Sequence, residues 1–225
     1  MLAHSLARVH DRVAAAAERA GRSSADVKLV AVSKTFPIDV LKMALEAGAT
    51  DLGENRAQEL KEKVTALGDA ARWHFVGPLQ TNKVRIVVGA AALVHSVDRA
   101  ELAEAISRRA VAMDVVQDVL IEVNLSGETA KHGTRAGDAA ELARTAQSLA
   151  GVSVGGLMTM APFSDDPETS RPYFRRLAQL REEVAEAVPG ATGLSMGMSR
   201  DFEVGIEEGA TIVRVGEAIF GARRR

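Results

Sequence analysis

The sequence predicts an α/β fold, namely a single (β/α)8 TIM barrel with an extra N-terminal helix. Short apolar segments rich in β-branched residues alternate with amphipathic segments along the chain, which is typical of parallel βα units. The connections between these segments are only a few residues long, and no linker or change of composition separates one part of the chain from another. A length of 225 residues is ordinary for one such barrel. We therefore expect residues 1–225 to form a single domain.

The first elements show this pattern. Apolar residues recur at spacings of three and four near the start, at Leu2, Leu6, Val9, Val13 and Ala17. This stripe predicts the amphipathic N-terminal helix. Residues 27–34 then form a continuous apolar run of the kind expected for a strand covered on both faces, as in a parallel sheet. A helix is expected from Pro37 to Ala47, followed by Gly48 as a stop signal.

The same strand and helix unit recurs along the rest of the chain. The further strands are expected at 50–53, 73–77, 92–96, 118–124, 153–158, 192–196 and 211–215. The helices between them are expected at 56–67, 80–88, 98–113, 135–150, 170–187 and 200–208, with a last short one after Gly216. An open doubly wound sheet remains the alternative, because a sequence does not show whether the strand order reverses. Residues 161–173 are expected to form a solvated loop, or a mobile rim, after the sixth strand.

Composition excludes several classes of function. The 28 basic and 30 acidic side chains give a net charge of −2, which does not predict nucleic acid or an anionic membrane as a partner. The absence of cysteine excludes disulfides, thiolate metal sites and a cysteine nucleophile, and it fits a reducing compartment. No apolar run approaches the roughly 20 residues of a membrane helix. We expect a cytoplasmic protein, and most simply a monomer.

Lys34 is the first candidate functional residue, because it ends the predicted strand 27–34. The other lysines lie on predicted helices, in a polar loop or at the start of that strand. TIM barrels carry their chemistry at the carboxyl ends of the strands. Burial there lowers the pKa of a lysine, which produces an amine able to form a Schiff base with a carbonyl group. A structural lysine that reaches solvent or pairs with Glu54 is the alternative.

A phosphate site is predicted at the turns after the last two strands, where TIM barrels frequently bind phosphate. Gly197 and Gly216 would let the main chain approach a ligand closely, and Ser195 and Ser199 offer hydroxyl groups. For Ser199, an ordinary helix N-cap is the alternative. Neither GxxxxGK[ST] nor GxGxxG occurs, so a nucleotide-binding loop is not indicated.

A ligand that carries both an aldehyde and a phosphate would span Lys34 and this phosphate site. Pyridoxal 5′-phosphate (PLP) has both groups, and so do the sugar phosphates of Schiff-base aldolases. Arg214 alternates with apolar residues in strand 211–215, so it is expected to point into the barrel. Opposite a pyridine nitrogen, it would keep that nitrogen unprotonated and weaken PLP as an electron sink. A structural ion pair with Glu122 or Glu217 is the alternative.

The remaining polar residues give weaker signals. The five histidines lack the spacing of metal ligands, so no metal site is expected. His74 and His95 are more typical of core or rim histidines than of catalysts. The carboxylates are dispersed, and no pair of them can be assigned the roles of acid and base.

Seven motifs follow one another in a characteristic order and spacing. They are AVSKT (31–35), GENRAQE (53–59), WHFVGPLQTNK (73–83), VNLSGETAKHG (123–133), GLMTM (156–160), LSMGMSRDFEVGI (194–206) and RVGEAIFG (214–221). Together they resemble the pyridoxal phosphate homeostasis proteins, which are single-domain relatives of the alanine racemase barrel. The resemblance runs from about residue 27 to the end of the chain. Arg56 and Thr81 depart from the residues common in that family, which is expected to alter only the rim of the site.

The resemblance implies a role for each site residue. Lys34 would hold PLP as a Schiff base, and Arg214 would face the pyridine nitrogen. The phosphate would be seated by Ser199 together with main chain around Met196 and Gly216. Three further positions match family motifs near the cofactor, namely Asn55 and His74 beside the ring and Lys131 as a secondary contact.

The resemblance also implies a carrier or buffer that acts in PLP homeostasis, with an indirect effect on amino-acid balance. A PLP racemase needs an acid or base on each face of the cofactor. In racemases the second base is a tyrosine from another domain, whereas Tyr173, the sole tyrosine here, ends the predicted loop 161–173. We therefore expect no catalytic residues and no enzyme. A low-activity racemase or decarboxylase, or less favourably a Schiff-base aldolase, stays open. The expected partners are PLP and, at most transiently, apo-enzymes that require it.

Overall fold

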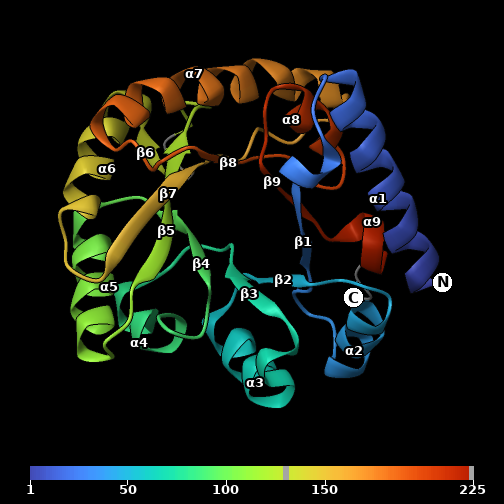
Figure 1. Ribbon diagram of the computed structural model, residues 1–225, viewed down its shortest axis with the longest axis horizontal. Coiled ribbons are helices and arrows are strands. Elements are labelled where there is room, and N and C mark those ends of the chain that lie inside the picture. The colour runs from blue at the N-terminus through green and yellow to red at the C-terminus, as the bar shows by residue number, and fades with distance from the viewer. Residues whose placement is uncertain (129–131, 223–225) are drawn as a thin grey trace.

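The computed structural model describes residues 1–128 and 132–222, and within these ranges eight parallel strands close into a barrel (Figure 1). Around the ring they are β1 (Lys28–Val32), β2 (Asp51–Glu54), β3 (Arg72–Phe75), β4 (Leu93–Val97), β5 (Gln117–Asn124), β7 (Val152–Met158), β8 (Gly193–Ser195) and β9 (Ile212–Val215). Pairing of β4 with β5 and of β1 with β9 leaves no edge in this ring. The predicted (β/α)8 barrel is confirmed, and the open doubly wound alternative is wrong.

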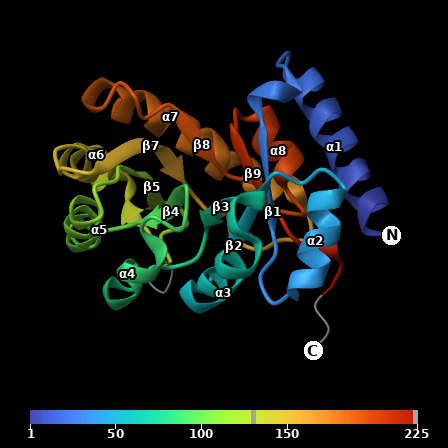
Figure 2. The same ribbon diagram turned by 60° about the horizontal axis from the view of Figure 1, so that its bottom comes forward.

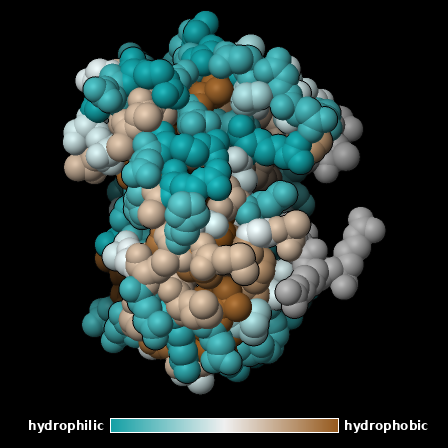
Figure 3. Space-filling view, turned by 90° about the vertical axis from the view of Figure 1, so that its right-hand side faces the viewer, coloured by the Kyte–Doolittle hydropathy of each residue, from teal (hydrophilic) through white to brown (hydrophobic). Residues whose placement is uncertain are grey.

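Helices surround the strands on the outside of the ring, and Figure 2 shows α2, α3 and α4 lying outside β1 to β4. They are α1 (Leu2–Arg19), α2 (Ile38–Glu46), α3 (Ala57–Leu67), α4 (Val84–Val87), α5 (Ala100–Ala112), α6 (Ala139–Gln147), α7 (Arg171–Ala187), α8 (Phe202–Glu207) and α9 (Glu217–Phe220). The extra N-terminal helix is α1, which packs its buried apolar face against α8 and α9. Its polar face is outward, in the upper half of Figure 3. None of the helices in the described ranges is long and apolar enough to cross a membrane.

Three boundaries differ from the predictions. Helix α4 spans Val84–Val87, because residues 81–83 form a 3₁₀ turn instead of extending it. Helix α6 begins at Ala139, because Thr134–Arg135 form the short strand β6 beside the end of β5. The loop predicted at 161–173 ends at residue 166, since the side chain of Asp166 caps a 3₁₀ turn that leads into α7.

The alternation of side chains along each strand sorts the core into two parts. Outward-facing residues such as Ala31 and Val213 join the large apolar layer between strands and helices. Inside the ring lies a small apolar cluster, made of Val30, Val32, Leu120, Met158 and Ile212. Val76 and Leu93 pack against this cluster. Buried polar side chains, among them His74, His95 and Arg214, lead to the site described below.

Candidate functional site at the mouth of the barrel

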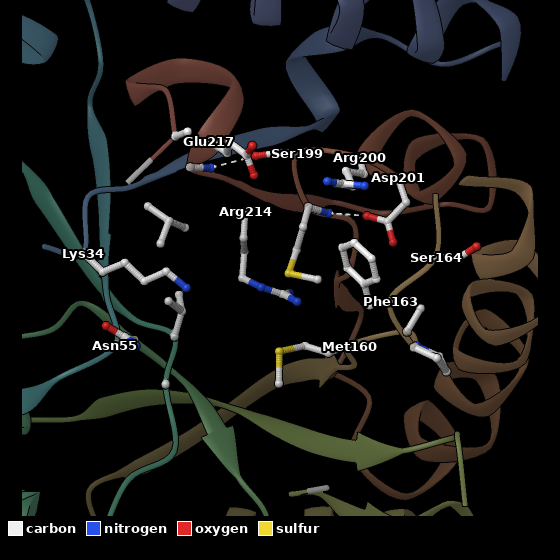
Figure 4. Close-up of a pocket in the computed structure, with 18 of the residues that line it drawn as sticks. Lys34, Asn55, Met160, Phe163, Ser164, Ser199, Arg200, Asp201, Arg214 and Glu217 are labelled. Carbon is white, nitrogen blue, oxygen red and sulfur yellow. Dashed lines mark hydrogen bonds between the residues drawn. The ribbon is translucent and has the colours of Figure 1, made fainter. Parts of the chain in front are cut away.

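A cavity of about 510 Å³ opens where β1, β2, β8 and β9 end, a volume typical of small-molecule sites. Five of the predicted site residues line it together: Lys34, Asn55, Ser199, Arg214 and Gly216. Figure 4 shows the Lys34 side chain extending across the cavity toward Arg214. Apolar walls come from Val32, Phe36, Val76, Met160 and Phe163. The cavity therefore brings a primary amine and a guanidinium group into one partly apolar space.

Asn55 contributes an unsatisfied polar atom to this cavity. It follows β2 directly, and its Oδ1 atom is buried without a hydrogen-bond partner among the described residues. A buried carbonyl oxygen without a donor is costly. A bound ligand that donates a hydrogen bond would remove this cost.

The turns after β8 and β9 meet at the hydroxyl group of Ser199. Its Oγ atom accepts hydrogen bonds from the main-chain N–H groups of Gly216 and Ala218, both at 3.2 Å. Gly197 adopts a φ of 93°, and a Cβ there would lie only 2.7 Å from the Cα of Phe202. At Gly216, a Cβ would lie 3.0 Å from the carbonyl oxygen of Val32. The two turns thus approach closely, with two amide hydrogens converging on Ser199 Oγ at the cavity wall. A hydroxyl group and main-chain N–H groups gathered in this way suit an anion.

Arg214 lies on β9 and is only 4% exposed. Its Nη1 donates to Ser195 Oγ at 2.5 Å, and its Nη2 donates to the carbonyl oxygen of Thr159 at 3.0 Å. Burial lowers the pKa of Arg214 to about 10, against the opposing effect of Glu122, so the guanidinium stays charged at neutral pH. Among the described residues its hydrogen-bond partners are Ser195 and Thr159. The ion pair with Glu122 or Glu217 that the sequence left open is not formed.

Arg214 is one end of a chain of hydrogen bonds through the barrel interior. Ser195 Oγ lies 2.9 Å from His95 Nδ1, His95 Nε2 lies 2.9 Å from His74 Nδ1, and His74 Nε2 lies 2.8 Å from Asp51 Oδ1. Because the carboxylate of Asp51 only accepts, a neutral His74 must donate to it from Nε2 and accept at Nδ1. A neutral His95 must then donate to His74 from Nε2 and accept at Nδ1, so the Ser195 hydroxyl donates to His95 while it accepts from Arg214. We call these five residues the interior chain.

The electrostatics agree with two neutral histidines in the interior chain. Burial lowers the pKa of His95 well below its ordinary value, and it also lowers the pKa of His74. At Asp51, burial alone would raise the pKa, but hydrogen bonds from His74 and Thr50 bring it down to about 2. The charges of the interior chain are therefore confined to its two ends.

Two predicted site residues lie away from the cavity wall. His74 points into the barrel between Asp51 and His95, because the register of β3 beside β2 turns it inward below the mouth. Met196 is fully buried in the outer apolar layer, and its N–H donates to the carbonyl oxygen of Ile212. Lys131 lies outside the described residues.

The sequence did not single out the residues at the rim. The guanidinium of Arg200 lies 4.6 Å from the centre of the Phe163 ring and donates to Asp165 at 2.5 Å. These contacts fasten the loop after β7 to the turn after β8. Asp201 steadies the same turn, since it accepts hydrogen bonds from the Met198 amide and the Ser170 hydroxyl. Two features of the sequence could have indicated these rim contacts, namely the acidic residues of loop 161–173 and the arginine within SMGMSRD.

Comparison with known proteins places the chain in a family. The family model "Alanine racemase, N-terminal domain" matches residues 5–224. A pyridoxal phosphate homeostasis protein of Aquifex aeolicus is 48% identical over 221 residues, which cover 97% of both chains. The structure of PipY from Synechococcus elongatus with PLP bound is 32% identical, with a TM-score of 0.85, and the match covers 98% of this chain and all of PipY.

A more distant likeness shows the fold alone. An alanine racemase of Clostridium difficile has a TM-score of 0.77 at 16% identity, and this chain covers 57% of its length. The nearer relatives match over nearly their whole length and at 32% identity or more. The chain therefore belongs to the pyridoxal phosphate homeostasis proteins, a family within the alanine racemase N-terminal-domain group.

Proposed function

We propose that this protein binds PLP in the cavity at the mouth of the barrel and holds it as a Schiff base on Lys34. One observation carries the proposal: the lysine amine of Lys34, the Ser199 hydroxyl with the Gly216 main chain, and the buried guanidinium of Arg214 line a single cavity. These groups match the aldehyde, the phosphate and the pyridine nitrogen of PLP. PipY, a relative at 32% identity, has PLP bound.

The covalent link needs only the amine of Lys34. In its uncharged form this amine would condense with the aldehyde, with a C=N bond replacing the C=O bond and one water molecule released. No oxidant or reductant is required. When bound, PLP would supply the aldehyde for this link and an electron-withdrawing ring.

Each remaining group has a distinct task in this proposal. The phosphate would be seated by the Ser199 hydroxyl and by the turn at Gly216, where the amides of Gly216 and Ala218 converge on Ser199 Oγ. The charged guanidinium of Arg214 would face the pyridine nitrogen and so disfavour its protonation. Asn55 offers its unsatisfied Oδ1 to the ring substituents. His74 and the main chain of Met196 act at a distance, through the packing beneath the mouth.

The role supported best is that of a PLP carrier or buffer in PLP homeostasis, rather than an enzyme. The relatives at 36–48% identity are named homeostasis proteins. Tyr173 packs on the outer core from α7, and it is not among the described residues that line the cavity. An arginine at the pyridine nitrogen also limits stabilisation of a carbanion, which amino-acid chemistry on PLP requires.

The proposal also covers the domain organisation, the location, the oligomeric state and the partners of the protein. We take residues 1–225 as one domain that acts in the cytoplasm as a monomer. Its partners would be PLP and, transiently, apo-enzymes that need PLP. The near-neutral net charge of −2 supports partners other than nucleic acid.

A spectroscopic experiment tests the function. The purified protein should be yellow, and reduction with borohydride should fix one PLP on Lys34, as seen by peptide mass spectrometry. It should also release PLP to an apo-enzyme faster than spontaneous exchange allows. A colourless protein that borohydride traps only with a sugar phosphate would instead indicate an aldolase, and exchange of α-protons of amino acids would indicate a racemase-like enzyme.

A further inference from the structure

The turn that carries Lys34 has a strained backbone. Thr35, the next residue, has a φ of 69°, in the left-handed region that β-branched residues rarely adopt. Such a conformation persists only where its surroundings hold it. Here the N–H of Thr35 donates to the carboxylate of Glu59 at 2.8 Å, a side chain from α3. The residue after Lys34 is thus held by a charged group outside the cavity.

The residue before Lys34 is held by the same group of side chains. Ser33 is fully buried, and its hydroxyl donates to Glu54 Oε1 at 2.6 Å. The carbonyl oxygen of Ser33 accepts a hydrogen bond from Lys63 Nζ at 2.9 Å. Both neighbours of Lys34 are therefore fixed from β2 and α3, while Lys34 itself lines the cavity.

We call Glu54, Glu59 and Lys63 the charged cradle. Lys63 is the centre, since its Nζ lies 2.6 Å from Glu54 Oε1 and 3.6 Å from Glu59 Oε2. Its side chain is only 7% exposed and that of Glu54 is fully buried. A buried lysine and glutamate are costly unless they are paired in good geometry. The other charged group on the cradle is the exposed Arg56, which lies 3.6 Å from Glu59.

We propose that the charged cradle is a positioning device for Lys34. It holds the backbone at 33–35 so that the Lys34 amine meets the aldehyde of a phosphate-anchored ligand at bonding distance. None of its three residues is among the described residues that line the cavity, so its members are positioning residues rather than catalytic ones. The inference rests on the proposed function, since it takes Lys34 as the amine that reacts with PLP.

The test compares two lysines of α3. Lys63→Met removes the centre of the cradle, and Lys61→Met, an exposed neighbour, is the matched control. Each full-length apo-protein is titrated with PLP, and the rate and extent of yellow colour are recorded. We expect Lys63→Met to react with PLP roughly tenfold more slowly, because small displacements of a reacting group have effects of this size or larger. The control should match the wild-type protein.

A second ligand separates positioning from collapse of the cavity. Pyridoxine 5′-phosphate carries an alcohol in place of the aldehyde, so it can occupy the site without reacting. Its affinity, measured by calorimetry, should be unchanged in Lys63→Met. Equal reaction rates with PLP for Lys63→Met and Lys61→Met would overturn the proposal, and so would an equal loss of affinity for both ligands.

Milder variants keep the test decisive if Lys63→Met does not fold. Glu59→Gln keeps an oxygen that can accept the Thr35 N–H, whereas Glu59→Ala removes it. We expect a slower reaction in Glu59→Ala than in Glu59→Gln. Thr35→Gly makes the left-handed conformation accessible without strain, so adding it to Glu59→Ala should restore part of the rate. A purely structural role of Glu59 would change thermal stability but leave the reaction rates equal.

The outcome also separates this inference from the proposed function. If Lys34→Ala still gives the yellow form, the assignment of Lys34 fails and the cradle has no reaction to assist. If Lys34→Ala loses the colour while all cradle variants react like the wild-type protein, the proposed function stands and the cradle proposal is wrong.

Discussion

The two basic groups that face each other in the cavity are held in opposite ways. Arg214 is held directly, by hydrogen bonds from its own guanidinium to Ser195 and Thr159. Lys34 is held through its neighbours, because the charged cradle binds Ser33 and Thr35 on either side of it. The two supports thus act at different points: Ser195 and Thr159 act on the guanidinium of Arg214 itself, whereas the cradle acts on the backbone on either side of Lys34.

The two supports also differ in charge. The cradle beside Lys34 consists of a lysine paired with two carboxyl groups at the outer side of the barrel wall, and burial raises the pKa of one of them, Glu54. The interior chain behind Arg214 passes through two histidines that burial keeps neutral. An ion pair close to Arg214 would compete with a ligand for its charge, while neutral partners leave that charge directed at the cavity.

The largest expected effect comes from removing the amine of Lys34. Lys34→Ala should abolish the yellow form and all labelling by borohydride, because no other amine is placed to replace it among the described residues lining the cavity. Lys42→Ala, on the exposed side of α2, is the control and should behave as the wild-type protein. Absorbance and peptide mass spectrometry give the result, and labelling of another lysine in Lys34→Ala would contradict the assignment.

Removing the guanidinium of Arg214 should chiefly lower the stability of the folded protein. Arg214→Met leaves the Thr159 carbonyl and the Ser195 hydroxyl without their donor in a buried place. We expect the free energy of unfolding to fall by about 1–3 kcal/mol for each group left unsatisfied. Urea denaturation measures this loss. An unfolding free energy equal to that of the wild-type protein would show that the interior chain does not depend on its charged end.

The interior chain predicts a specific pH dependence. His95 has a folded-state pKa well below the unfolded value of about 6.5, so its contribution to stability is present above that pH and is lost as the pH falls. His95→Gln removes this titration and keeps one donor and one acceptor. Below pH ~6.5, the wild-type protein should lose up to about 1.4 kcal/mol per pH unit more than the variant. Parallel curves of unfolding free energy from pH 5 to 8 would contradict a buried neutral His95.

The smallest effect is expected at the exposed rim. Arg200 contacts the exposed residues Phe163 and Asp165, and such contacts contribute about 1 kcal/mol or less. Arg200→Ala should therefore leave stability nearly unchanged, while the loop after β7 becomes looser and PLP is released faster. Stopped-flow transfer of PLP to an apo-enzyme measures the release rate. A slower release would show that Arg200 holds the mouth open instead of closing it.

The barrel could be predicted from the sequence because each of its strands and helices has a local pattern of residues. Periodicity and β-branched runs identified every barrel strand. The strand predicted at 27–34 ends at Val32, so Lys34 lies in the turn that follows β1 and not in the strand itself. The interior chain could not be predicted, because it depends on the register of five strands that are far apart in the sequence. His74 illustrates the limit: its motif places it near the mouth, and only the pairing of β3 with β2 shows that it faces Asp51.

The charged cradle escaped prediction for a related reason. Lys63 reads as one of several lysines on a helical stretch, and nothing in its local pattern shows that it is buried. The strained φ of Thr35 leaves no trace in composition either. Tertiary packing of α3 against the end of β1 creates both features.

The one-way order of hydrogens in the interior chain has a consequence for protein engineering. Each of its members comes from a different strand, namely β2, β3, β4, β8 and β9. A residue that replaces one member must offer the same donor and acceptor at the same places, as the glutamine of His95→Gln does. Grafting this mouth onto another barrel would therefore mean transplanting all five positions at once, as one indivisible part.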